Sequence, residues 1–314
     1  MADPNNPSMP NIPTREDVER ARVTIGDRLA RTPLQSSRTI GAWLKCELFQ
    51  RTGSFKPRGA LNKISNLTPD ERARGVITIS AGNHAQGVAW AAREENVDAL
   101  VVMWHGASEL KMAATLGYGA TLDLESANPM EAFERLAALQ RETGRVFVDP
   151  HSDPLVIAGH GTAGLEIAED APDFDAVVVG VGGGGLVSGL VAALPGRRVI
   201  AVEPELAQSL HAGIAAGARV AAEARSIADG CNSPFAGELA IAMTRDLELV
   251  LVTEEEIEHA FRFLYQRAKL AVEPAGAVAT AAWLAGKIEA QNPVLMVSGG
   301  NVATQTAAAI LARP

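Results

Sequence analysis

The sequence is poor in cysteine, in clustered histidine and in positive charge, and each shortage excludes a class of protein. Its only cysteines, Cys46 and Cys231, lie far apart, which fits a reducing compartment and excludes a disulfide framework. Its six histidines are scattered and lack the spacing of a zinc site. The formal net charge is −9 and no basic stripe occurs, so a nucleic-acid partner is not expected.

Targeting and membrane-spanning segments are also missing. Residues 1–13 contain four prolines and lack the apolar core of a signal peptide, so they are predicted to form a flexible arm. The longest stretch without charge, residues 176–196, has the length of a membrane span. Its valines and consecutive glycines favour a strand, a loop and a helix instead. We therefore expect a soluble, cytoplasmic protein without a membrane partner.

What the chain does have is a regular alternation of strand-like and helix-like segments, in a composition typical of globular proteins. Between residues 68 and 151, this alternation predicts a parallel α/β sheet in a small domain. The strands are expected at 76–79, 99–103, 121–124 and 146–148, and the helices at 85–95, 108–116 and 129–143. Later strands, expected at 176–179, 199–202, 249–252 and 294–297, predict a second sheet.

The segment Gly53–Ala60 places one lysine, Lys56, between Phe55 and Pro57. These neighbours predict a partly buried turn that runs into a helix. Burial and a neighbouring cation such as Arg58 favour the neutral amine, which is the form in which a lysine acts as a nucleophile or base. The alternative is an ordinary lysine at the start of a helix, with its ammonium group in water.

Four consecutive glycines, residues 182–185, follow the expected strand 176–179 and precede a helix-like segment that begins at Leu186. Such a turn lets the backbone N–H groups of a helix N-terminus approach a phosphate closely. From Gly180 onward the glycines also satisfy the G-x-G-x-x-G pattern, and Glu203 lies near the position of a ribose-binding acid. A nicotinamide-dependent oxidoreductase is therefore an alternative from a different class.

Two further strand ends carry polar residues beside glycines. Residues 80–84 follow strand 76–79 and precede a helix, so their backbone N–H groups and polar side chains suit a carboxylate. An ordinary capped helix start is the alternative. Ser298-Gly299-Gly300-Asn301 follows strand 294–297, at the strand ends where ligands gather in open parallel sheets.

Together and in this order, these segments resemble the pyridoxal-phosphate enzymes of the serine/threonine dehydratase and serine racemase group. The resemblance extends from about Arg22 to Ala308 and includes Leu44–Gln50, Ile227–Gly230 and Glu273–Ala277. It implies the tryptophan-synthase-β type of fold, with two open parallel-sheet α/β domains. In that fold, residues 1–67 and 152–314 form a large cofactor-binding domain, and residues 68–151 form a small mobile domain.

The resemblance also implies a role for each motif residue. Lys56 forms a Schiff base with pyridoxal phosphate and then acts as a base, with Phe55 and Glu273 beside the cofactor. Asn83 contacts the 3-oxygen of the ring, and Ser298 bonds the pyridine nitrogen. The phosphate binds to Gly182, Gly183, Gly184, Gly185 and Leu186, and the substrate carboxylate to Ser80, Ala81, Gly82, Asn83 and His84.

The implied reaction is β-elimination of L-threonine or L-serine to a 2-oxo acid and ammonia in a homo-oligomer, a dimer or a tetramer. Alternatives are a serine racemase, a dehydratase for 3-hydroxyaspartate or phenylserine, and a non-catalytic sensor. Ala81 stands where the racemases of this family have a serine, so racemisation is expected to be slow. The sequence ends soon after Ser298, so the regulatory domain of biosynthetic threonine dehydratases and its feedback control are not expected.

A divalent cation is expected to bind weakly or not at all. Family members that bind one use a glutamate like Glu203, a backbone carbonyl near Ala207 and an aspartate where this chain has Ser209. Magnesium and calcium prefer oxygen sites that include carboxylates, and here one of the charged oxygen ligands is missing.

Overall fold

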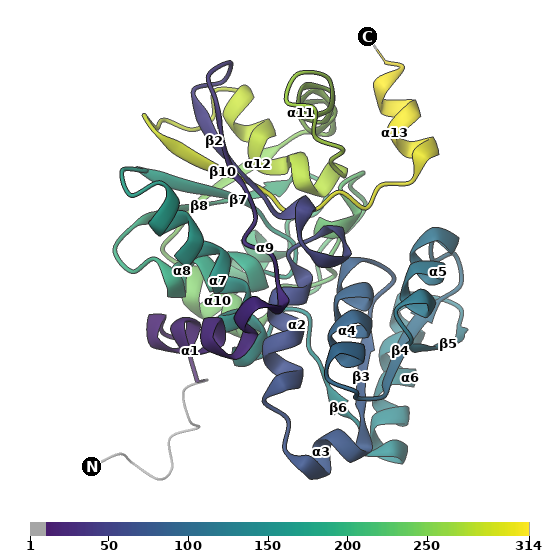
Figure 1. The fold of residues 1–314 in the computed structure, drawn as a ribbon. Coiled ribbons are helices and arrows are strands. Elements are labelled where there is room, and N and C mark those ends of the chain that lie inside the picture. The colour runs from purple at the N-terminus through teal and green to yellow at the C-terminus, as the bar shows by residue number, and fades with distance from the viewer. Residues whose placement is uncertain (1–10, 314) are drawn as a thin grey trace.

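The computed structural model describes residues 11–313, and residues 1–10 of the predicted arm lie outside this range. Two β-sheets lie side by side, each covered by helices (Figure 1). The larger sheet has the strand order β1-β2-β10-β7-β8-β9. Its strands are β1 (Leu34–Ser37), β2 (Ala42–Cys46), β7 (Ala176–Gly180), β8 (Arg198–Pro204), β9 (Glu248–Val252) and β10 (Pro293–Val297).

The smaller sheet has the order β5-β4-β3-β6, and all its strands are parallel. Its strands are β3 (Val76–Ile79), β4 (Ala99–Trp104), β5 (Thr121–Ser126) and β6 (Val146–Phe147). The eight strands expected from the alternation are all confirmed, with ends that differ by at most a few residues. The antiparallel edge strand β1 was not expected, because its four residues, Leu-Gln-Ser-Ser, are half-exposed and carry no apolar run.

Most helices connect successive strands. They are α1 (Arg15–Ile25), α2 (Lys56–Ser65), α3 (Pro69–Arg74), α4 (Asn83–Glu94), α5 (Glu109–Gly117), α6 (Pro129–Thr143), α7 (Pro154–Asp170), α8 (Gly185–Ala193), α9 (Ser209–Ala216), α10 (Glu238–Thr244), α11 (Glu254–Gln266), α12 (Pro274–Leu284) and α13 (Thr304–Leu311). The short 3₁₀ turns are η1 (Gly26–Arg28), η2 (Glu47–Phe49), η3 (Arg51–Gly53) and η4 (Asp229–Cys231). No helix among residues 11–313 is long and apolar enough to cross a membrane.

The early part of the chain rejoins the late part inside the larger sheet. Strand β2 pairs in parallel with β10, and an isolated bridge joins Ser54, eight residues after β2, to Gly299, two residues after β10. This pairing places the segment that contains Lys56 beside the polar residues that follow β10.

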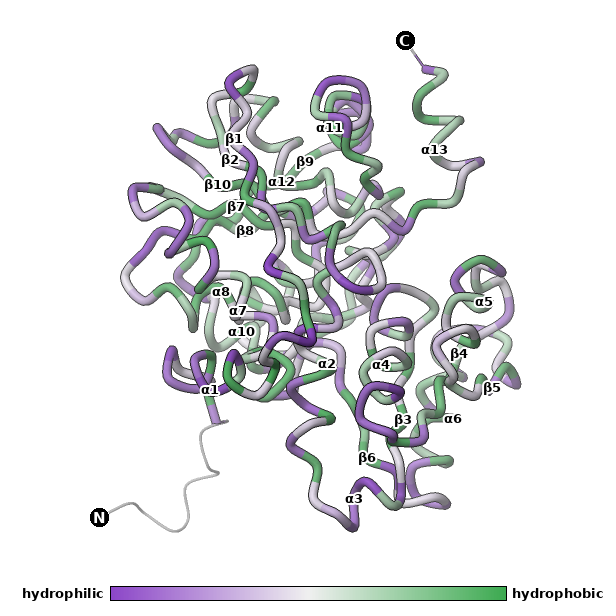
Figure 2. Tube along the Cα trace, in the orientation of Figure 1, coloured by the Kyte–Doolittle hydropathy of each residue, from purple (hydrophilic) through white to green (hydrophobic). Residues whose placement is uncertain are grey.

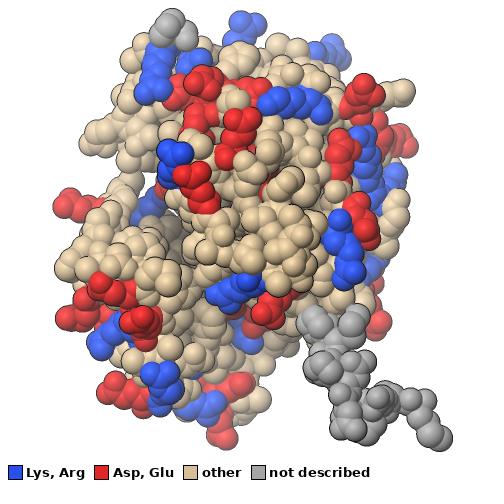
Figure 3. Space-filling view, turned by 180° about the vertical axis from the view of Figure 1, so that it is seen from behind, with Lys and Arg blue, Asp and Glu red and all other residues tan. Residues whose placement is uncertain are grey.

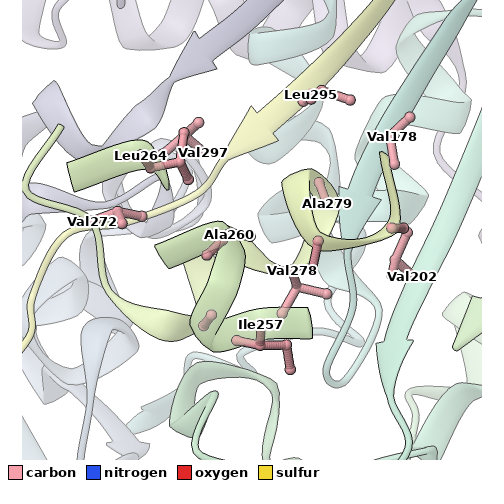
Figure 4. Close-up of a cluster of buried hydrophobic side chains, with 14 of the residues drawn as sticks. Val178, Val202, Ile257, Ala260, Leu264, Val272, Val278, Ala279, Leu295 and Val297 are labelled. Carbon is pink, nitrogen blue, oxygen red and sulfur yellow. The ribbon is translucent and has the colours of Figure 1, made fainter. Parts of the chain in front are cut away.

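On one face of the larger sheet the core lies between the strands and helices α11 and α12 (Figure 4), and on the other face it includes residues of α7 and α8. Val178, Val202 and Leu295 from the sheet meet Ile257 and Val278 from these helices, and all five are fully buried. Burying one such side chain contributes about 1.5–3 kcal/mol, so this core holds the strand ends of the site in place. Figure 2 shows that the central strands are hydrophobic, whereas many segments at the periphery are hydrophilic.

On the face that points away from the viewer in Figure 1, no large region carries charges of one sign only. Acidic and basic side chains lie intermixed there (Figure 3). Nothing on this face resembles the basic footprint of a nucleic-acid-binding protein.

Candidate active site

Lys56 is the first residue of α2, directly after the turn that the sequence predicted. Its Nζ lies 3.4 Å from the carbonyl oxygen of Pro150 and 5.0 Å from the centroid of the Phe55 ring. Burial lowers the pKa of its ammonium group to about 8, although Asp149 and Glu273 act in the opposite direction. The amine is therefore much more readily deprotonated than a lysine in water.

Arg58 does not cause this shift. Its guanidinium points away from Lys56 into a buried cluster, where it bonds to Glu47 at 2.7 Å and to Glu166 at 2.7 Å. Lys45 completes the cluster through a 2.5 Å contact with Glu166. Two cations and two carboxylates thus balance one another. Of the two causes expected for the lowered pKa of Lys56, burial acts and Arg58 does not.

The glycine turn lies between β7 and α8, as predicted. Gly184 adopts the left-handed conformation, with φ of 92°, and caps the helix. Among residues 11–313, the amide N–H groups of Gly183, Gly184, Gly185 and Leu186 find no acceptor in backbone or side chain. Several amides that point from a helix N-terminus without partners form a site for an anion.

The turn after β3 contains Ser80, Ala81 and Gly82, and α4 begins at Asn83. The Ser80 hydroxyl accepts a hydrogen bond from the amide of Gly82 at 3.1 Å. The imidazole of His84 is buried and its Nε2 lies 3.0 Å from the carbonyl oxygen of Val148. The other ring nitrogen, Nδ1, is buried and has no hydrogen-bond partner within residues 11–313.

The Asn83 side chain links the two sheets. It donates to Glu273 Oε1 at 2.6 Å, and its own oxygen accepts from Asn301 at 2.8 Å. Burial raises the pKa of Glu273 to about 7, with a further contribution from Asp229, and Glu273 Oε2 has no hydrogen-bond partner within residues 11–313. A carboxyl group that is only partly ionised near neutral pH therefore stands beside Asn83.

Ser298 directly follows β10, on the other side of the same space. Its carbonyl oxygen accepts from the amide of Phe55 at 3.1 Å, which fixes it next to Lys56. Its hydroxyl makes no hydrogen bond with any residue of the described range 11–313, so it is free to bind a ligand.

Two of the three positions considered for a cation, Glu203 and Ser209, make other hydrogen bonds. Both carboxylate oxygens of Glu203 accept backbone hydrogen bonds at the start of α9, from Leu210 at 2.7 Å and from His211 at 2.9 Å. The Ser209 hydroxyl donates to the carbonyl oxygen of Gly182 at 3.0 Å, and burial raises the pKa of Glu203 to about 7. No group of three or more histidines, cysteines and carboxylates that could hold a metal occurs within residues 11–313.

The sequence analysis missed two contributors to this space. Asn301 was noted only as part of a motif, although it holds Asn83 in place. Pro150 and His151 were not noted at all, although they lie between Lys56 and the glycine turn. The loop of Pro150 and His151 could have been noticed from the polar run Asp-Pro-His-Ser-Asp that follows a strand. Only the fold shows that this loop lies beside Lys56.

The residues present fit pyridoxal phosphate. A lysine amine with a lowered pKa suits the cofactor aldehyde, and the partnerless amides of the glycine turn suit its phosphate. The free hydroxyl of Ser298 and the amide of Asn83 suit the polar atoms of its ring. These three kinds of group come together although they are distant in sequence.

Comparison with known proteins agrees with this fit. A family model described as pyridoxal-phosphate dependent enzyme matches residues 25–300. The catabolic L-threonine dehydratase TdcB of Staphylococcus aureus (strain USA300) is 44% identical over 308 residues, which cover 91% of this chain and 88% of the relative. A threonine deaminase from T.th. superposes with a TM-score of 0.86 at 39% identity, over 93% of this chain and 99% of that chain. Maize serine racemase gives a TM-score of 0.89 at 33% identity, over 94% and 95% of the two chains. These likenesses confirm the predicted fold class.

Proposed function

Because this chain belongs to the family of pyridoxal-phosphate-dependent enzymes, we propose that it is an ammonia-lyase that eliminates the β-hydroxyl group of L-threonine and L-serine. The products are a 2-oxo acid and ammonia. The arrangement of Lys56 between the glycine turn and Ser298 carries this proposal. The 44% identity to an L-threonine dehydratase supports the substrate class.

The cofactor would be held at four points. Lys56 would bind it covalently beside Phe55, the amides of Gly182–Leu186 would bind the phosphate, and Ser298 would bond the ring nitrogen. Asn83, oriented by Glu273 and Asn301, bonds the 3-oxygen. When bound, pyridoxal phosphate supplies a ring that stabilises negative charge at the substrate Cα.

The protein residues then handle the carboxylate and the proton. The turn Ser80–Gly82 and the N-terminus of α4 bind the substrate carboxylate, because free backbone N–H groups and the helix dipole favour an anion there. The neutral amine of Lys56 removes the Cα proton, a role for which its pKa of about 8 is suited. Ser298, a neutral partner, does not enforce protonation of the ring nitrogen, and this favours prompt loss of the hydroxyl.

Ala81 favours elimination over racemisation. Racemisation needs a second acid or base on the face of the substrate opposite Lys56, and the methyl group of Ala81 neither donates nor accepts a proton. The contacts of Glu203 with the backbone of α9 leave it poorly suited both to a divalent cation and to a ribose. We therefore propose that catalysis needs no divalent cation.

Three further properties belong to the proposal. The protein acts in the cytoplasm, forms a homo-oligomer, and has no nucleic-acid or membrane partner. Its small domain, residues 68–151, moves relative to the large domain of residues 1–67 and 152–314. The ion pair between Lys111 of α5 and Asp229 of η4, which joins these two parts, supports closure over the substrate.

A keto-acid assay tests the proposed function. The purified protein is incubated with L-threonine, L-serine, 3-hydroxyaspartate or phenylserine, and the release of keto acid and ammonia is measured. We expect turnover of threonine or serine, and its loss in Lys56→Ala with an unchanged far-ultraviolet circular dichroism spectrum. Lys63→Ala, on the same helix, is the matched control and retains activity. Release of keto acid only from the two larger substrates would contradict the proposed substrate class.

A further inference from the structure

The loop between β6 and α7 packs directly on the glycine turn. A Cβ atom added to Gly183 would lie 2.5 Å from Cγ and 2.6 Å from Nδ1 of His151. A Cβ added to Gly185 would lie 3.0 Å from the Cα of His151. The His151 ring therefore touches the turn whose amides have no partner within residues 11–313.

The backbone of this loop is fixed, so the imidazole is held where it stands. Asp149 Oδ1 accepts from the amides of His151 and Ser152 at 2.8 and 2.7 Å. The carbonyl oxygen of Pro150 accepts from Lys56. On its outer side the ring of His151 faces that of Phe235, with centroids 5.9 Å apart.

The imidazole nitrogens themselves are available. Neither makes a hydrogen bond with another residue of the range 11–313, and the side chain is only partly buried. Because the side chain is partly exposed, these nitrogens are open to a bound molecule. They stand beside the partnerless amides, and an anion on the glycine turn can accept hydrogen bonds from the amides and from an N–H of His151.

The charges around His151 determine its protonation. Burial is the main reason why the pKa of its imidazole lies at about 4; the cations Lys56 and Arg219 lower it further and Asp149 opposes them. His84, on α4, is the other titratable group that faces it, and its imidazole is also neutral. An anion on the glycine turn would act as Asp149 does, because an opposite charge within about 4–6 Å raises the pKa of a cation by about one to three units.

We propose that His151 binds the phosphate group of the cofactor and takes up one proton from solvent when that group docks on the glycine turn. The inference rests on the proposed function, since it takes the cofactor to be pyridoxal phosphate. At His151 only a proton is transferred, from water to an imidazole nitrogen. The condensation of the Lys56 amine with the cofactor aldehyde, which releases one water molecule, is common to pyridoxal phosphate and pyridoxal and so cancels in their comparison. The phosphate is then held by neutral amides on one side and by a cation on the other, and a charge-assisted hydrogen bond is stronger than a neutral one.

Calorimetry measures this proton directly. The full-length apoprotein is titrated with pyridoxal phosphate or with pyridoxal, which lacks the phosphate, in two buffers of different ionisation enthalpy. The unmodified protein is compared with His151→Asn, which keeps a hydrogen-bond donor but cannot take up a proton. His259→Asn, at an exposed position of α11, is the matched control.

Near pH 6 we expect the unmodified protein to take up as much as one proton more per site than His151→Asn does when pyridoxal phosphate binds. We expect His259→Asn to behave like the unmodified protein. The excess shrinks as the pH rises through about 5–7, the range to which a bound phosphate would raise the pKa of His151. Pyridoxal gives no such excess. His151→Asn binds pyridoxal phosphate about tenfold more weakly and pyridoxal with unchanged affinity. Unchanged pyridoxal affinity also shows that the variant is folded.

Two results would overturn the inference alone. One is equal proton uptake by the unmodified protein and His151→Asn, and the other is an equal loss of affinity for both ligands, which would make His151 a packing residue. An unmodified protein that gains no visible absorption band with pyridoxal phosphate would overturn the proposed function together with this inference.

Discussion

Arg58 anchors the helix that begins with Lys56, and removing its charge should destabilise the whole protein. Its side chain is only 2% exposed and bonds to two carboxylates, Glu47 and Glu166. In Arg58→Met, Glu166 keeps Lys45 as a partner. Glu47 keeps only the hydroxyl of Thr32, at 2.5 Å, among the described residues 11–313. One buried carboxylate is thus left without a compensating cation.

Removing one partner of a buried ion pair costs about 3–5 kcal/mol. The matched control is Arg20→Met on α1, where the guanidinium is 61% exposed and pairs with Glu16 at 2.9 Å within one helix. Such exposed pairs contribute less than about 1 kcal/mol. The structure therefore predicts a difference of several kcal/mol between two substitutions that are identical in chemistry.

Urea denaturation followed by circular dichroism measures both free energies of unfolding. Because burial and not Arg58 lowers the pKa of Lys56, the folded Arg58→Met variant should link pyridoxal phosphate with an unchanged pH dependence. A loss below about 1 kcal/mol would refute the buried-charge argument. A rise of about one unit or more in the pKa of Lys56 would show that Arg58 acts on the amine directly.

Three other predictions concern the site. The rate at which pyridoxal phosphate links to Lys56 should rise with pH and level off above about pH 8, because the neutral amine reacts and its pKa is about 8. Stopped-flow absorbance measures this rate. A rise that continues to about pH 10, near the pKa of a lysine in water, would contradict the prediction. Dialysis against EDTA should leave keto-acid release almost unchanged; loss of most activity and its return with magnesium would show that Glu203 does ligate a cation. The unmodified protein should give keto acid with little D-amino acid, and Ala81→Ser should raise the rate of racemisation. Chiral chromatography of the remaining substrate measures the D-amino acid. If D-serine accumulates as fast as pyruvate with the unmodified protein, the role assigned to Ala81 is wrong.

The order of elements followed from local patterns. Val76–Ile79 is a buried β-branched run and forms β3 within the bounds expected. Thr68 and Glu71 form a capping box at the start of α3, and Gly75 ends that helix. These features depend on residues that are neighbours in sequence, so a single sequence suffices to predict them.

The connections between distant segments could not be predicted in the same way. Asn83 bonds to both Glu273 and Asn301 across the two sheets, and no spacing rule links residues so far apart. Arg58 is adjacent to the Lys56 segment in sequence, which suggested an electrostatic effect on the amine. The Arg58 side chain points into the cluster with Glu47 and Glu166 because of the packing of α2 against α7, and only the fold shows this orientation.

The central claim is that Lys56 is the residue that holds pyridoxal phosphate, and one measurement tests it most directly. The protein is incubated with the cofactor, reduced with borohydride, digested and analysed by mass spectrometry. The account predicts that the added mass lies on Lys56, in the peptide that contains Phe55 and Pro57. Attachment to Lys45, which is buried in an ion pair with Glu166, or to Lys63 would contradict it.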